Sequence, residues 1–373
     1  MSSTSNLGAI VAWGGFVLGF VFGAVANRTN FCTMGAVSDV VNMGSWGRMR
    51  MWLLAIAVAI IGTQALQLSG QIDLAKSFYV RPNMTWLSYV LGGFLFGVGM
   101  TLGSGCGSKT LVRLGGGSLK SVVVFVFFGI AAYMTLKGLF AIWRISALDP
   151  VALDLGSRGI ARQDLPTMIS SLGGTNLRAT TVAVAALVAG ALLLFVFKDS
   201  DFRASPDHML GGAVIGLTIV GGWYVTGHLG FGENPETLEE TFFNTNSRTI
   251  ESLSYTAPVA YTIELLMLWS DKSLTVSFGV AAVIGIVLGS FAYAVASRTF
   301  RWEGFAGAED TAMHVIGGLL MGFGGVTALG CTIGQGLTGF STLALGSILA
   351  FLAIVAGSAL TMKWQYWRMS REA

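Results

Sequence analysis

The chain alternates between long apolar runs and short polar connections. Nine of the runs contain 18 residues or more, which is about the length at which an apolar helix crosses the hydrocarbon core of a bilayer. They lie at residues 8–26, 51–69, 86–103, 121–142, 180–197, 209–228, 275–296, 312–329 and 343–362. A tenth apolar piece, 253–269, is shorter and contains Pro258 and Glu264, which predicts a partial or interfacial helix. The pattern predicts an all-α polytopic membrane protein with about nine transmembrane helices and further short broken or re-entrant helices.

Composition supports this class and excludes several others. Of 373 residues, 53% are hydrophobic and only 11% are charged, whereas a soluble domain carries about 25% charged residues. The formal net charge is only +3, and no basic run suggests a nucleic-acid partner. The first residues, MSSTSN, lack the positive region of a signal peptide, so the run 8–26 is interpreted as a membrane span.

The basic residues predict an orientation. With the N-terminus outside, 13 of the 22 Lys and Arg fall in inner connections, as the positive-inside rule requires. Nine spans then place the C-terminus inside, in the cytoplasm.

One segment of the chain occurs in two similar copies. The segment 92–117, GGFLFGVGMTLGSGCGSKTLVRLGGG, resembles 317–339, GGLLMGFGGVTALGCTIGQGLTG, at a shift of 225 positions. An odd number of spans gives the two copies opposite directions across the membrane. We therefore expect a first inverted half at 1–150, a connection with the odd helix at 151–207, and a second half at 208–373. Inverted repeats with broken helices are typical of secondary transporters. A weaker match, VLGFVFGAVANRT at Val17 with VLGSFAYAVASRT at Val287, implies the same direction for both copies and is given no architectural weight.

The three cysteines are the main candidates for chemistry. Cys32, Cys106 and Cys331 each lie where an apolar span gives way to Gly, Thr or Ser. A free cysteine usually behaves as a small buried hydrophobe, but here all three fall at such breaks and two are related by the repeat. The absence of a CxxC spacing argues against a zinc site or a disulfide framework, and no metal or cofactor is expected.

Helix breaks within a membrane leave backbone N–H groups free, and such groups favour anions. Together with soft thiols, they suit a sulfur-bearing anion. The nine spans contain no Asp or Glu, whereas cation-coupled carriers commonly place ionisable groups there. The basic residues Arg28, Lys109 and Arg113 flank the first two cysteines; they either attract the anion or extend to lipid headgroups. Asp39 is expected either to cap a helix or to pair with a basic neighbour, and the three histidines are expected to form interfacial hydrogen bonds.

The motifs RTNFCTMG, GGFLFGVGMTLGSGCGS and GGLLMGFGGVTALGCTIGQG resemble the three cysteine motifs of the bacterial YeeE/YedE family. The resemblance implies a pseudo-symmetric, hourglass-like protein of the bacterial inner membrane that imports thiosulfate and is not an enzyme. It also implies that the three cysteines relay the ion by S–H···S hydrogen bonds. The substrate-binding residues expected on this basis and from the helix breaks are Cys32, Cys106, Cys331, Gly105, Gly107, Gly330, Thr332, Arg28 and Arg113.

Two alternatives stay open. The first alternative is a transporter of another sulfur or selenium species. The second is a membrane thiol–disulfide redox protein, which the absence of a CxxC spacing disfavours. In similar systems a soluble cytoplasmic sulfur-carrier protein acts downstream, which makes such a protein a candidate partner. The region 227–273 is not part of the shared motifs.

Overall fold

A computed structural model describes residues 2–234 and 237–372, and it is 73% helical with almost no sheet. This confirms the all-α polytopic class. The first part of the chain forms α1 (Ser2–Arg28), α2 (Thr33–Ser38), η1 (Asp39–Met43), α3 (Gly47–Leu68), η2 (Leu74–Lys76), η3 (Phe78–Val80), β1 (Asn83–Met84), α4 (Trp86–Leu102), α5 (Gly107–Gly115) and α6 (Leu119–Lys137).

A connecting region follows, with α7 (Leu139–Trp143), η4 (Arg144–Leu148), β2 (Leu153–Asp154), η5 (Gly156–Arg158), α8 (Leu165–Gly173), α9 (Leu177–Phe197) and α10 (Ser200–Arg203). The last part forms α11 (Pro206–Tyr224), η6 (Val225–Leu229), β3 (Phe231–Glu233), β4 (Glu240–Phe242), α12 (Thr256–Met267), α13 (Phe278–Ala296), α14 (Ala308–Thr327), η7 (Gly334–Gly339) and α15 (Leu345–Glu372). Two short antiparallel ribbons, β1 with β2 and β3 with β4, lie in the connections.

Among the described residues, eight helical segments have the length and hydropathy to cross a membrane. The expected span 312–329 is not among these eight, but it forms the 20-residue helix α14, whose first turn carries Glu309 and Asp310. The expected span 121–142 was too long. Gly138 adopts an extended conformation with φ −108° and ψ −153°, which ends α6 at Lys137, and a separate helix α7 begins after it.

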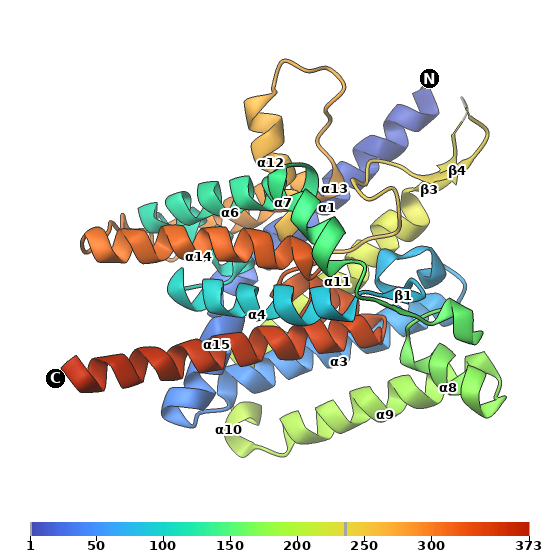
Figure 1. The fold of residues 1–373 in the computed structure, drawn as a ribbon, viewed down its shortest axis with the longest axis horizontal. Helices are drawn as coiled ribbons and strands as arrows, with labels where there is room; N and C mark the ends of the chain where they lie inside the picture. The colour runs from blue at the N-terminus through green and yellow to red at the C-terminus, as the bar shows by residue number, and fades with distance from the viewer. Residues whose placement is uncertain (1, 235–236, 373) are drawn as a thin grey trace.

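The long helices lie side by side, with α9 at one edge against α3 and with α4 between α15 and α14 (Figure 1). The centre of this stack is the crossing of α4 and α14. A Cβ atom on Gly92 would lie 2.8 Å from the Gly324 carbonyl oxygen, and one on Gly99 would lie 2.7 Å from the Gly317 oxygen. Because the start of α4 meets the end of α14, the two helices are antiparallel, which is the relation predicted for the duplicated segments.

Two further helix pairs run parallel. Gly15, Gly19 and Gly23 of α1 meet successive residues Phe278, Ala282 and Ile286 of α13, so both helices run in the same direction. In the same way, α3 contacts α11 at residues whose numbers increase along both helices, so this pair is also parallel. Small residues permit this backbone approach in a bilayer, where van der Waals packing is the main force between helices. The similarity of the segments at Val17 and Val287 therefore lies within two helices that pack together in parallel.

Candidate functional site

The three cysteines occupy one recurring local structure. The residue two positions before each has a left-handed backbone: Asn30 (φ 52°), Ser104 (φ 56°) and Leu329 (φ 58°). The residue just before each cysteine donates its N–H to a carbonyl five residues earlier, at 3.1, 2.9 and 2.8 Å for Phe31, Gly105 and Gly330. This is the Schellman pattern that ends a helix. Each cysteine therefore stands directly after a terminated helix.

A new helical turn starts after every cysteine. The carbonyls of Cys32, Cys106 and Cys331 accept N–H groups four residues later, at 2.9, 2.9 and 2.8 Å. At Cys32 and Cys331 the sulfur itself accepts a backbone N–H, from Gly35 and Gly334, each at 3.4 Å. Cys106 differs, because its sulfur lies 3.3 Å from the Ser108 hydroxyl. Because their sulfurs accept a backbone N–H of the first turn, Cys32 and Cys331 serve as N-caps of these helical pieces.

The fold brings the three thiols together in the protein interior. Cys32 is 5% exposed, and Cys106 and Cys331 are fully buried. The thiols of Cys32 and Cys106 are neighbours, and the Thr332 hydroxyl lies near Cys106. The Cys331 sulfur also lies near the Tyr255 backbone and near Cys106. The thiols thus form a short row in the order Cys32, Cys106, Cys331.

A cavity of ≈ 490 Å³ opens at the Cys32 end of this row. Cys32 lines it, together with Arg48, Lys109, Arg113 and Arg301 as cations and Glu303 as the one acid in the lining. We call it the Cys32 vestibule. The basic excess favours anions in this space.

A second cavity, of ≈ 210 Å³, opens at the other end of the row and reaches Gly330, the neighbour of Cys331. We call it the Gly330 vestibule; its wall includes Tyr79, Arg144, Glu251 and Thr256. Glu251 is half-buried and accepts a hydrogen bond from the Ser247 hydroxyl at 2.6 Å. Burial raises the pKa of the Glu251 carboxyl to about 7, so its charge depends on pH near neutrality.

The two vestibules lie at opposite ends of the helix bundle. Gly279 at the start of α13 lines the Gly330 vestibule, and Ala294 near its end lines the Cys32 vestibule. Helix α6 repeats this arrangement, with Ser118 and Leu136. Fifteen residues of helix separate Gly279 from Ala294, which is about 22 Å. The buried thiols lie between two openings on opposite faces.

The remaining expected site residues fall in different places. Arg113 lines the Cys32 vestibule and donates to the Ser104 carbonyl at 2.6 Å. Gly105 packs beside Lys109, whereas a Cβ on Gly107 would meet the Phe128 ring at 3.2 Å, so Gly107 faces α6. Arg28 is half-exposed and pairs with Asp207 at 3.1 Å instead of lining the Cys32 vestibule. Substrate contact by these residues stays a prediction.

The two carboxylates nearest the predicted spans, Asp39 and Glu264, both have protein partners. Asp39 forms a bidentate pair with Arg48, which agrees with its expected pairing to a basic neighbour. Glu264 accepts from Tyr133 at 2.8 Å and Lys137 at 3.1 Å.

Several residues that shape the site were not found from the sequence. Arg48, Arg301 and Tyr255 lie outside the cysteine motifs, and Ser108 lies inside the second motif with nothing in the sequence to mark its contact with Cys106. Thr33 was available as a signal, because it follows Cys32 as Thr332 follows Cys331.

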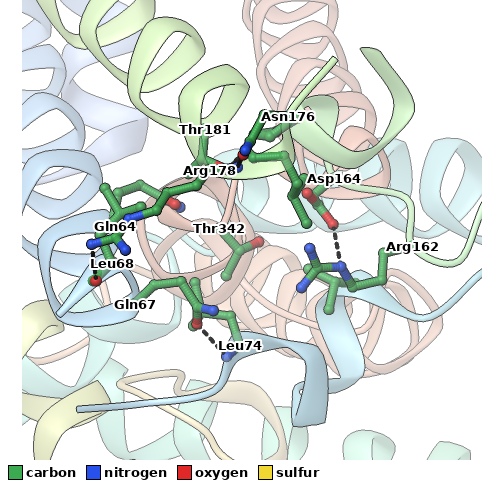
Figure 2. A pocket seen from close by; sticks show the side chains of 13 residues that line it. Gln64, Gln67, Leu68, Leu74, Arg162, Asp164, Asn176, Arg178, Thr181 and Thr342 are labelled. Atoms are coloured by element: carbon green, nitrogen blue, oxygen red, sulfur yellow. Dashed lines mark hydrogen bonds and ion pairs between the residues drawn. The ribbon is translucent and has the colours of Figure 1, made fainter. Parts of the chain in front are cut away.

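A third cavity, of ≈ 460 Å³, lies between α3, α8 and α9 and holds none of the cysteines (Figure 2). Its polar groups pair with the protein. Arg162 bonds to Asp164 at 3.2 Å and Arg178 to the Leu68 carbonyl at 3.3 Å. The Gln67 side chain accepts from the Leu74 N–H at 2.7 Å. These polar groups of the cavity are therefore paired with one another or with the backbone.

Known proteins resemble this chain over most of its length. A protein of Spirochaeta thermophila named thiosulfate transporter TsuA is 28% identical over 381 residues, a match that covers 95% of this chain and 99% of the relative. A protein of Escherichia coli with the same name is 28% identical over 342 residues, covering 87% of this chain and 86% of the relative. The sulphur transport family matches residues 28–360, a range that includes all three cysteine motifs. The chain therefore belongs to the sulphur transport family, the YeeE/YedE family of membrane transporters that its cysteine motifs resemble.

Proposed function

We propose that the protein transports a small sulfur-containing anion, with thiosulfate as the leading substrate. The proposed route runs from the Gly330 vestibule past Cys331, Cys106 and Cys32 into the Cys32 vestibule. The observation that carries the proposal is the row of buried thiols between two openings at opposite ends of the bundle. Both relatives are named as thiosulfate transporters, which supports this choice among sulfur anions.

The proposed passage works by hydrogen-bond exchange. A thiol is a weak donor with a polarisable sulfur, so it binds the terminal sulfur of the anion without holding it tightly. The ion passes from one S–H group to the next, and no covalent bond forms or breaks. Backbone N–H groups of Gly334 and Gly35 point at the outer two sulfurs and add positive potential along the route.

The charges at one end of the route attract an anion toward that end. Arg48, Lys109, Arg113 and Arg301 surround the Cys32 vestibule with only Glu303 as a lining acid. An anion that leaves the thiol row enters this basic space. By the positive-inside rule this vestibule faces the cytoplasm, so the proposed transport is import across the bacterial inner membrane. The basic vestibule is also where a cytoplasmic sulfur-carrier protein would receive the ion.

We further infer that the chain consists of two inverted halves, 1–150 and 208–373, joined by 151–207. The reciprocal contacts support this division. Gly92 contacts Gly324, and Gly99 contacts Gly317. At the shift of 225, Gly92 corresponds to Gly317 and Gly99 to Gly324, so exchanging the two halves turns one contact into the other. A pseudo-two-fold axis in the membrane plane is typical of such transporters.

Uptake of ³⁵S-labelled thiosulfate into proteoliposomes tests the proposal. Cys106→Ala is expected to abolish uptake, because Cys106 is the middle thiol of the row and nothing replaces its S–H group. Size-exclusion chromatography of the detergent-solubilised variant controls for folding. Normal uptake by folded Cys106→Ala protein would refute the relay. Competition by unlabelled selenium and sulfur anions in the same assay ranks the substrates.

One observation keeps a redox function as the second candidate. The thiols of Cys32 and Cys106 are neighbours, so a disulfide between them is a testable alternative. Alkylation of free thiols during turnover, followed by mass spectrometry, distinguishes the two. The transport proposal expects both thiols to stay reduced, and the redox candidate expects a cycling disulfide.

A further inference from the structure

The tetrapeptide Cys-Thr-x-Gly occurs twice, as CTMG at 32–35 and CTIG at 331–334. The two copies share their local geometry. In each, the glycine N–H donates to the cysteine sulfur at 3.4 Å, and the cysteine carbonyl accepts the first helical hydrogen bond. The threonine therefore occupies the same place relative to its thiol in both copies.

Both threonine hydroxyls are buried without a hydrogen-bond partner. Thr33 is 2% exposed and Thr332 is fully buried, and neither hydroxyl oxygen has a partner among the described residues. Three threonines inside other spans behave differently. Thr101, Thr135 and Thr361 donate to the carbonyl four residues earlier at 3.1, 2.7 and 2.7 Å. A threonine directly after a helix break has no helical turn before it to supply that carbonyl.

An unpaired buried hydroxyl costs free energy unless something completes its hydrogen bonds. The Thr332 hydroxyl lies near the Cys106 thiol without a hydrogen bond to it, and Thr332 follows Cys331 directly in the chain. The Thr332 hydroxyl therefore lies between the Cys106 and Cys331 positions of the row. Here the wall offers two soft sulfurs and one hard O–H donor. An anion with a terminal sulfur at one end and oxygens at the other matches both kinds of donor.

We propose that the Thr332 hydroxyl binds the oxygen end of the anion while Cys331 and Cys106 bind its terminal sulfur, and that this pairing selects anions carrying both. The inference rests on the proposed function and adds a residue that selects the substrate. It favours a sulfur atom bonded to an oxyanion group over an ion without oxygen. Transport involves no bond making, so the hydroxyl acts only by donating a hydrogen bond.

The test compares thiosulfate uptake kinetics of Thr332→Val, Thr332→Ser and Thr63→Val in proteoliposomes. Valine keeps the branched shape and removes the hydroxyl, whereas serine keeps the hydroxyl. Thr63 is the matched control, since it is equally buried and also lacks a partner, yet it lies within α3 and outside the cysteine motifs. We expect kcat/KM to fall about tenfold or more in Thr332→Val, the effect of losing one hydrogen bond to a charged group. Thr332→Ser should recover to within about threefold, and Thr63→Val should match the wild type.

A second readout separates recognition from structure. Thiocyanate has a terminal sulfur and no oxygen, so the concentration at which it inhibits uptake should change less than the KM for thiosulfate in Thr332→Val. A wild-type kcat/KM in folded Thr332→Val protein, or no recovery in Thr332→Ser, would overturn the inference. If Thr332→Val fails to fold, Thr332→Ala is read in the same way. Cys106→Ala is assayed in parallel. If Cys106→Ala is inactive while Thr332→Val is normal, only the proposed role of the Thr332 hydroxyl is refuted. If Cys106→Ala transports normally, the proposed relay by the thiols is refuted.

Discussion

The crossing of α4 and α14 yields the most direct test of the architecture. We expect Gly92→Ala and Gly317→Ala to destabilise the protein to a similar extent. A Cβ on Gly92 would lie 2.5 Å from the Ala328 backbone nitrogen, and one on Gly317 would lie 2.5 Å from the Gly103 backbone nitrogen. Both positions meet backbone rather than a movable side chain. The helices must therefore separate to admit either methyl group.

The magnitude follows from the contacts. An ordinary carbon contact is about 3.5–4.0 Å, so each methyl group requires a separation of roughly 1 Å at the crossing. Overpacking of this kind costs about 1–3 kcal/mol. Gly190→Ala on α9 is the matched control, because nothing lies within 4 Å of its Cβ position. All three substitutions gain the same helix propensity, about 1 kcal/mol. The difference between each crossing variant and the control is therefore the overpacking cost alone.

Unfolding of the purified protein in mixed detergent micelles, followed by helical circular dichroism, measures this difference. Thiosulfate uptake is a second readout, because α4 and α14 end just before Cys106 and Cys331. Separation of the helices should displace these thiols and lower uptake in both crossing variants. If Gly92→Ala and Gly317→Ala are as stable as Gly190→Ala, the close crossing is wrong. If only one of the two is destabilised, the reciprocity of the crossing is wrong.

Two further predictions concern charge. In the Gly330 vestibule, the pKa of Glu251 is raised to about 7 from 4.5, so the folded protein favours the neutral carboxyl, and this contribution to stability is lost as pH rises through about 7. We expect uptake to fall as pH on that side rises from about 6 to 8, because the carboxylate repels the anion, and Glu251→Gln to flatten the profile; equal slopes would contradict this. Asp39→Asn should destabilise the protein by about 1–2 kcal/mol, since it breaks the charge-assisted pair with Arg48. Asp207→Asn, in an exposed pair, should cost about 0.5 kcal/mol or less in the same unfolding measurement, and an equal loss in both would show that burial of the Asp39 pair is unimportant.

The spans were predictable because hydropathy is a local property. Each long apolar run became a helix, and α14 formed although Glu309 and Asp310 lower its mean hydropathy. The end of α6 at Gly138 was not predictable, because leucine, phenylalanine and alanine continue the apolar pattern beyond it. Only the backbone conformation at that glycine separates α6 from α7.

By itself, the amino-acid sequence determined the membrane class, the duplicated segments and the helix breaks at the three cysteines. These depend on residues close together in the chain: apolar length, glycine spacing and the residues around each cysteine. Tertiary structure alone decided that Cys32 and Cys106 are neighbours, that the cysteine row lies between two vestibules, and that Arg48 and Arg301 join one of them. Those contacts join residues far apart in sequence, and they depend on how closely the glycines of α1, α4, α13 and α14 let the backbones approach.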